Sequence, residues 1–167
     1  MNSNIPDLIA QYRDKGILID TNLLLVLVVG NIDRRLVGRM GRTEKYTSDD
    51  YERISELLSC FNRLIILPQV LTETGNMLKR NCPYRNTLLD LGLELKRFVH
   101  ARDTRESRAS SKRITLHPTF EELGYADAAI LHAAADRHLV FTDDGPLQGM
   151  AYQVGVDVLP FYWLRSS

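Results

Sequence analysis

The chain has few of the residues that mark several common classes of protein. Of its 167 residues only two are cysteines, Cys60 and Cys82, and they form no CxxC pair. We therefore expect reduced thiols rather than a disulfide or a zinc site. The longest apolar run, 23–29, has seven residues, far short of the roughly 20 that cross a bilayer. The polar N-terminus also lacks the charged and apolar regions of a signal peptide, so the sequence predicts a cytoplasmic protein without a membrane span.

An excess of charge of either sign is also missing. Lys plus Arg and Asp plus Glu each total 21, which gives a formal net charge of +0. This balance excludes the strongly basic nucleic-acid binders and the proteins with acidic tails. The chain is 44% hydrophobic, which is enough to bury a core and excludes disorder as the main state. The length predicts a single domain over 1–167.

Short apolar runs alternate with helical patterns along the chain. The runs are apolar at consecutive positions, as in strands buried on both faces of a parallel sheet; they are Gly16–Ile19, Leu64–Leu67, Leu139–Phe141 and Val156–Leu159. Helical spacing of apolar residues covers Thr47–Phe61, Asn86–Ala101 and Tyr125–His138. This alternation predicts an α/β fold with a central parallel sheet covered on both sides. The polar segment Arg102–Lys112 has no such pattern and is expected to be a loop.

An acid follows the first of these predicted strands. Asp20 lies in the otherwise apolar stretch Gly-Ile-Leu-Ile-Asp-Thr-Asn-Leu-Leu-Leu. A carboxylate at the end of a buried strand is costly unless it is paired, hydrogen-bonded or bound to a cation. Ligands also bind at that edge of open α/β sheets. The alternative is structural, because Asp is a preferred N-cap and could simply start a helix at this point.

Other acids occupy similar positions. Glu73 lies at the edge of the apolar stripe of a helix that follows the second strand, and Asp127 lies near the start of an alanine-rich helix. Asp143 and Asp144 follow the strand Leu139–Phe141. The structural alternative for Glu73 and Asp127 is a first-turn acid that favours the helix dipole. For Asp143 and Asp144 it is a turn.

Taken together, these acids predict one shared site at the carboxyl edge of the sheet. Carboxylates that converge there repel one another and therefore need a cation. Hard oxygen ligands without His or Cys suit Mg²⁺ or Mn²⁺. An open acidic pocket that holds such ions is a common arrangement for phosphodiester hydrolysis.

The ordered set of motifs resembles that of the PIN-domain nucleases. It consists of Leu18-Ile19-Asp20-Thr21-Asn22 before a leucine run, Pro68-x-Val70-x-x-Glu73-x-x-Asn76, Asp127-Ala128-Ala129-Ile130, and Thr142-x-Asp144. The resemblance implies an α/β/α sandwich around a parallel sheet and a Mg²⁺- or Mn²⁺-dependent endoribonuclease that acts on RNA. The family includes the VapC-type toxins of toxin–antitoxin pairs, so it also implies a possible protein inhibitor, an antitoxin.

The same resemblance assigns roles by position. The implied metal-binding and catalytic acids are Asp20, Glu73, Asp127 and Asp144, and a register shift by one would make Asp143 the ligand in place of Asp144. Asn22 is implied to orient a ligand or a substrate phosphate, and Thr142 to hydrogen-bond behind the ligands. The alternative for Thr142 is a plain strand-end residue. The chain departs from compact VapC-type toxins in its length and in an extra polar stretch, Asn31–Lys45.

Basic residues gather in two segments. If four acids hold metal, the remaining side chains sum to about +4, since 21 basic minus 17 acidic residues leaves 4. One segment, Lys96–Arg113, contains the candidate RNA-binding residues Arg102, Arg105, Arg108, Lys112 and Arg113; the other is Asn31–Lys45. We expect both to flank the acids and to grip phosphates, with an affinity that falls steeply with salt. The alternative is that they are solvated surface.

The remaining candidates favour structural roles. The histidines, His100, His117, His132 and His138, show no metal-ligand spacing with cysteine. The aromatic tail of Phe161, Tyr162 and Trp163 is expected to close the core or to form a subunit contact, as in a homodimer. Two other functions remain open. One is a catalytically silent PIN-like module that binds RNA or a protein, and the other is the same chemistry on DNA or a small phosphoester.

Overall fold

The computed structural model describes residues 4–81, 85–101, 103–135 and 137–166. It contains a five-stranded sheet with the order β3-β2-β1-β4-β5, in which every adjacent pair is parallel. The strands are β1 (Ile17–Ile19), β2 (Leu64–Ile66), β3 (Thr104–Glu106), β4 (Leu139–Thr142) and β5 (Val158–Pro160). Strand β1 is central, because Ile17 pairs with Leu64 of β2 on one side and with Leu139 of β4 on the other. The expected parallel sheet is confirmed.

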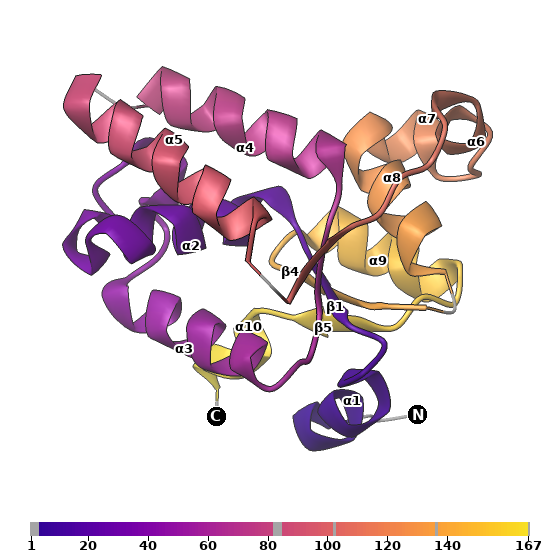
Figure 1. Ribbon diagram of the computed structural model, residues 1–167. Coiled ribbons are helices and arrows are strands. Elements are labelled where there is room, and N and C mark those ends of the chain that lie inside the picture. The colour runs from indigo at the N-terminus through magenta and orange to yellow at the C-terminus, as the bar shows by residue number, and fades with distance from the viewer. Residues whose placement is uncertain (1–3, 82–84, 102, 136, 167) are drawn as a thin grey trace.

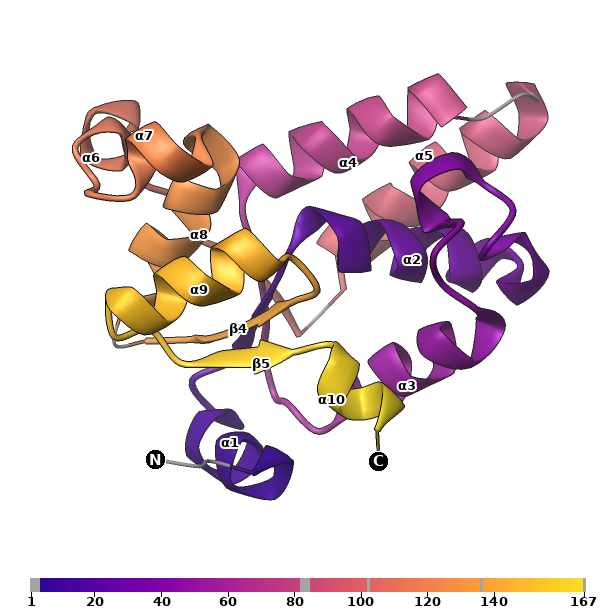
Figure 2. The same cartoon turned by 180° about the vertical axis from the view of Figure 1, so that it is seen from behind.

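Helices cover both faces of this sheet. The α-helices are α1 (Ile5–Tyr12), α2 (Thr21–Ile32), α3 (Ser48–Ser59), α4 (Pro68–Asn81), α5 (Arg85–Val99), α6 (Ser111–Thr115), α7 (Phe120–Leu123), α8 (Tyr125–Ala134), α9 (Gly145–Gln153) and α10 (Tyr162–Arg165), and two 3₁₀ turns are η1 (Arg34–Leu36) and η2 (Gly41–Thr43). In Figure 1, α2 to α5 lie to the left of the sheet and α6 to α9 to its right. The reverse view in Figure 2 shows the same two layers. This arrangement is the α/β/α sandwich that the sequence predicts.

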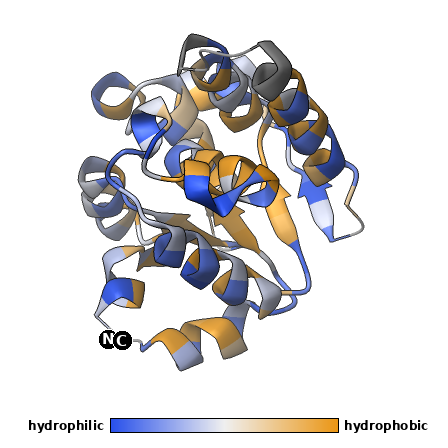
Figure 3. Ribbon diagram, turned by 90° about the vertical axis from the view of Figure 1, so that its left-hand side faces the viewer, coloured by the Kyte–Doolittle hydropathy of each residue, from blue (hydrophilic) through white to orange (hydrophobic). Residues whose placement is uncertain are grey.

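Helix α2 forms the centre of the core. Its residues from Leu23 to Gly30 are all buried, so the helix is apolar on every side, as expected for one enclosed by other elements. Figure 3 shows it as the hydrophobic helix near the centre of the view. Gly30 is required by packing, since a Cβ there would lie 2.2 Å from Cδ2 of Tyr51 on α3.

Helix α3 begins as its sequence predicts. Thr47 is the N-cap, its hydroxyl accepts from the backbone N–H of Asp50 at 3.2 Å, and the Asp50 carboxylate accepts from the Thr47 N–H at 2.9 Å. This reciprocal pair is a capping box. The buried Asp50 also receives two hydrogen bonds from Arg165, of 2.9 and 2.7 Å. The guanidinium thereby ties the end of the chain to the start of α3.

The prediction that Arg102–Lys112 is a loop is wrong in part. Strand β3 lies within it and α6 begins at its end. Strand β3 has no apolar pattern because it is an edge strand in which only Thr104 is buried and both Arg105 and Glu106 are exposed. Helix α1 was also not predicted, and β5 begins later than expected, at Val158 rather than Val156.

The remaining structural expectations concern the tail, the cysteines and the membrane. Phe161 is buried, with its ring centroid 6.2 Å from that of Phe141, whereas Tyr162 is exposed. Cys60 has a free thiol, and Cys82 lies outside the described residues. In the described ranges, no helix is both long enough and apolar enough to cross a membrane.

Candidate functional site

The acidic residues lie at the carboxyl edge of the sheet, beside its topological switch point. Strands β1 and β4 are neighbours, but the chain leaves β1 into α2 on one face and leaves β4 into α9 on the other. Divergence of this kind opens the crevice in which open α/β sheets bind ligands. Asp20 follows β1, and Asp143 and Asp144 follow β4. Because helices run back antiparallel to the strands, the starts of α4 and α8 bring Glu73 and Asp127 to the same edge.

Asp20 is both a helix cap and a buried acid at this edge. Its Oδ1 accepts from the Leu23 N–H at 2.8 Å, so the structural alternative of an N-cap is confirmed. Its Oδ2 accepts from the Thr142 hydroxyl and from the Asp143 N–H at 3.3 Å. The side chain is 4% exposed. Burial, and then the charge of Asp143, raise the pKa of Asp20 to about 7 in spite of these hydrogen bonds.

The Thr142 hydroxyl joins two of the acids. It donates to Asp20, and it accepts from the backbone N–H of Asp144 at 2.9 Å. Asp144 in turn caps α9, because its Oδ1 accepts from the Leu147 N–H at 2.9 Å. Thr142 is fully buried. The hydrogen bond expected of this residue is therefore present, and it fixes Asp20 relative to the start of α9.

The charges of Glu73 and Asp144 act on Asp127, and no basic side chain among the described residues contacts any of the three. Burial, and then the charges of Asp144 and Glu73, raise the pKa of Asp127 to about 6. The Asp127 carboxylate makes no hydrogen bond or ion pair with the described residues. Glu73 Oε2 accepts from the Thr21 hydroxyl at 2.9 Å. We call Glu73, Asp127 and Asp144 the acidic triad.

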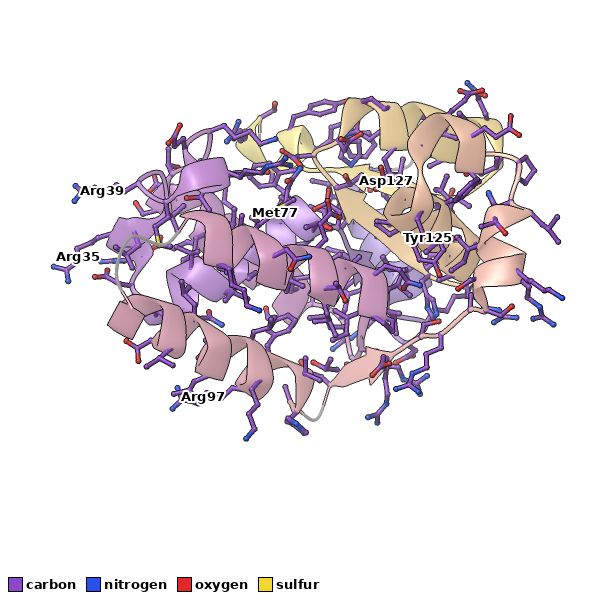
Figure 4. The ribbon with its side chains drawn as sticks, turned by 90° about the horizontal axis from the view of Figure 1, so that it is seen from above. Arg35, Arg39, Met77, Arg97, Tyr125 and Asp127 are labelled. Atoms are coloured by element: carbon purple, nitrogen blue, oxygen red, sulfur yellow. The ribbon has the colours of Figure 1, made fainter. Side chains whose placement is uncertain are left out.

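A cavity opens beside the triad. It has a volume of about 630 Å³, lies between the first turns of α4 and α8, and is lined by Glu73, Asp127 and Tyr125 among others. Figure 4 shows Asp127 and Tyr125 close to each other on this side of the molecule. Asn76, from the second motif, also lines it. The cavity gives the triad access to a ligand larger than an ion.

Asp143 has a different environment from Asp144. Its Oδ1 accepts from the Asn22 amide at 3.2 Å, and its Oδ2 accepts from the Tyr46 hydroxyl at 2.5 Å and from the Lys45 ammonium. We call Asn22, Lys45 and Tyr46 the Asp143 clamp. Burial and the bond to Asp143 raise the pKa of Tyr46, which stays a neutral donor. Both oxygens of Asp143 are occupied, whereas Oδ2 of Asp144 accepts nothing from the described residues.

Sequence reasoning missed three side chains of this site. Thr21, Lys45 and Tyr46 all contact the acids. Thr21 could have been found, because it stands next to Asp20 in the first motif. The sequence places Lys45 in a basic stretch but does not predict its contact with an acid. Nothing in the sequence distinguishes Tyr46, an aromatic residue next to that stretch, as part of the site.

The donor set fits a partly hydrated divalent cation. Carboxylate oxygens are the ligands that Mg²⁺ prefers, and Mg²⁺ is usually held by one or two of them while it keeps several waters. The acidic triad offers such oxygens and lacks a neutralising partner among the described residues. Among the described residues, no group of three or more Asp, Glu, His or Cys side chains is arranged so that it could hold a metal ion. An ion at this edge would therefore need waters to complete its ligands.

The predicted RNA-binding residues that the structure describes lie on β3, on α6 and in the segment between them. Arg105 is exposed on β3, Arg108 forms an ion pair of 2.5 Å with Glu106, and Lys112 and Arg113 are exposed on α6. Arg108 and Arg113 line a separate concavity of about 490 Å³ with Arg137 and His132. Arg102 lies outside the described residues. No contact joins the described members of this set to the acids, so their role stays a prediction.

The second basic stretch does not flank the acids as expected. Arg34 pairs with Glu52 at 2.6 Å, and Arg35 pairs with Asp33 at 2.8 Å. Figure 4 shows Arg35 and Arg39 on the opposite side of the molecule from Asp127. Lys45 is the exception, because it contacts Asp143. A basic run that is continuous in sequence is therefore divided in space.

Comparison with known protein families and with curated sequences identifies no relative of this chain. The chain matches no model of a known protein family, and no curated protein is significantly similar to it in sequence.

Proposed function

We propose that this protein is a Mg²⁺- or Mn²⁺-dependent endoribonuclease that hydrolyses phosphodiester bonds of RNA. The observation that carries the proposal is the acidic triad: Glu73 and Asp127 line one cavity, the charges of Glu73 and Asp144 act on Asp127, and no basic side chain among the described residues contacts any of the three. Its position at the switch point of the sheet, beside an open cavity, is where a ligand is expected.

Each side chain has a role in this scheme. Glu73, Asp127 and Asp144 would hold the ion, which supplies polarisation of the phosphoryl group and stabilises charge on the leaving oxygen. Asp20 adds negative charge behind them, and Thr142 keeps it oriented toward the start of α9. Asp144 rather than Asp143 is the fourth acid, because both oxygens of Asp143 are already occupied.

RNA is the proposed substrate on two grounds. The ordered acidic motifs resemble those of the PIN-domain nucleases, and the concavity lined by Arg108, Arg113 and Arg137 offers cations to a phosphate backbone. On the same resemblance, the protein would act in the cytoplasm, could form a homodimer, and could be the toxin of a pair that a protein antitoxin inhibits.

The test is cleavage of labelled oligonucleotides. Internal cuts are expected in single-stranded RNA with Mg²⁺ or Mn²⁺, with EDTA abolishing them and added Mn²⁺ restoring them. Asp127→Asn should lower the rate by at least about 100-fold, since it removes a ligand charge where catalysis is electrostatic. Asp90→Asn, which changes an exposed acid on α5, is the matched control and should be unaffected.

Other outcomes would redirect the proposal. Equal turnover in EDTA would contradict a metal-dependent reaction. RNA binding without cleavage under any metal condition would indicate the silent RNA-binding module. Faster turnover of DNA or of a nitrophenyl phosphate would keep the chemistry and change the substrate.

A further inference from the structure

Lys45 brings a positive charge to an edge that is otherwise acidic. Its ammonium contacts the Asp143 carboxylate. In the described part of the chain, no other basic side chain contacts Asp143 or any of the acids Asp20, Glu73, Asp127 and Asp144. The acids at this edge of the sheet thus fall into two groups. Among the described residues, no basic side chain contacts the acidic triad, whereas Asp143 contacts Lys45.

The fold places Lys45 there through a tightly turned segment. Gly38 has a φ of +84°, and a Cβ on it would lie 2.8 Å from the backbone oxygen of Tyr46, so the segment folds directly back onto residue 46. The Thr43 hydroxyl accepts from the Gly38 N–H at 3.2 Å and donates to the Met40 oxygen at 2.8 Å. The 38–46 loop is therefore held by its own hydrogen bonds.

The C-terminal helix fixes the other side of this loop. Arg165 donates to the Lys45 backbone oxygen at 2.9 Å, and its guanidinium lies 5.9 Å from the ring centroid of Tyr46 and 5.0 Å from that of Phe161. Arg165 is itself held by the buried Asp50. Arg165 and the hydrogen bonds within the 38–46 loop thus fix the backbone at Lys45, so the position of its side chain at the acidic edge is a consequence of the fold.

The Lys45 ammonium still has donors to offer. An ammonium carries three N–H groups; among the described residues Asp143 is its one charged partner, and the Tyr46 ring centroid lies 5.2 Å from it. The Lys45 side chain is 56% exposed, whereas that of Asp143 is 11% exposed. A solvent-facing ammonium held by a buried carboxylate is suited to bind an anion with its remaining donors.

We infer that Lys45 binds a phosphate group of the RNA backbone at this edge, and that Asp143, with Asn22 and Tyr46, holds it in position. The inference rests on the proposed function for the identity of the substrate. It follows from charge: an approaching phosphate meets repulsion from the acids, and Lys45 is the group that can offset it on the side of Asp143. A phosphate contact of this kind positions the chain without reading its sequence.

The test measures RNA binding in EDTA, where no metal-dependent turnover occurs. Fluorescence anisotropy follows a labelled single-stranded oligoribonucleotide across salt concentrations. For Lys45→Met, the slope of log affinity against log salt should fall in magnitude by about 0.7, which corresponds to about fivefold weaker binding near 0.1 M salt. Lys45→Arg keeps the charge and should keep the wild-type slope. Lys96→Met, at an exposed lysine on α5, is the matched control.

The outcomes separate this inference from the proposed function. A Lys45→Met slope equal to those of wild type and Lys96→Met overturns the phosphate site, even if wild type cleaves RNA. A wild type that cleaves nothing, but binds RNA through Lys45, overturns the nuclease and keeps the site. No RNA binding by wild type overturns the inference. If Lys45→Met does not fold, Lys45→Gln gives the same reading, because it removes the charge and retains a polar side chain.

Discussion

Replacing Asp20 by Asn should make the metal-free protein more stable at high pH. Asp20 is 4% exposed, and its pKa in the folded protein is about 7. Asn keeps the volume, and it is as good an N-cap as Asp for α2. The substitution therefore removes a buried negative charge while it retains the hydrogen bond that the Leu23 N–H donates.

The magnitude follows from linkage. Between pH 4 and 7 the folded state binds the Asp20 proton more tightly than the unfolded chain, so this residue makes stability fall as pH rises. The gap between a pKa of about 7 and the ordinary value of 3.8 corresponds to about 4 kcal/mol, of which about 3 kcal/mol arises between pH 4.5 and 8. The Asn amide is a poorer acceptor than a carboxylate for the Thr142 hydroxyl and the Asp143 N–H. The weaker hydrogen bonds offset about 1 kcal/mol of this stabilisation.

Urea unfolding in EDTA at pH 4.5 and pH 8 measures the effect. Relative to wild type, Asp20→Asn should be more stable by about 2–3 kcal/mol at pH 8 and close to wild type at pH 4.5. A variant that is destabilised by the same amount at both values would refute the reasoning, because Asp20 would then act only as a neutral structural group. Under the proposed function the variant should also lose cleavage, because it removes a negative charge from the edge that would bind the cation while it stabilises the fold.

Asp50→Asn is the matched control for this experiment. Asp50 is as buried as Asp20, and burial alone would raise its pKa, but hydrogen bonds from Arg165 and from Thr47 outweigh burial and lower it. The ionised Asp50 therefore stabilises the fold at any pH above the pKa of an unfolded Asp. This stabilisation is lost as the pH falls through the pKa of Asp50 in the folded protein. Asp50→Asn should therefore destabilise the protein at pH 8 by about 1–3 kcal/mol, with a smaller effect in acid.

Further substitutions test packing and the choice of ligand. Gly30→Ala should lower the free energy of unfolding by about 1–3 kcal/mol, because its Cβ would overlap the Tyr51 ring. Gly92→Ala, where a Cβ on α5 meets nothing within 4 Å, should instead raise it by up to about 1 kcal/mol; thermal unfolding of both variants gives the comparison, and equal shifts would contradict it. Asp144→Asn should weaken Mn²⁺ binding, measured by calorimetry, by at least about tenfold, whereas Asp143→Asn should change it less. The reverse order would make Asp143 the ligand.

The sequence by itself determined the elements whose signals are local. Apolar runs fixed β1, β2 and β4 within a residue, because a strand buried on both faces needs apolar side chains at every position. The start of α3 could also be predicted from the sequence, because a capping box lies within four consecutive residues. The acids could be ordered along the chain, and the parallel topology then implied that they share one edge.

Only the tertiary structure decided which acid has which partner. Asp143 and Asp144 are adjacent in sequence, yet Asp143 is held by Tyr46, 97 positions away, whereas the charge of Asp144 acts on Asp127. Strand β3 likewise depends on pairing with β2 and has no apolar pattern of its own. Periodicity reports which face of an element is buried, whereas hydrogen bonds and charges between distant segments arise only when packing brings those segments together. For that reason the sequence predicted an acidic edge, and the fold alone supplied the lysine at it.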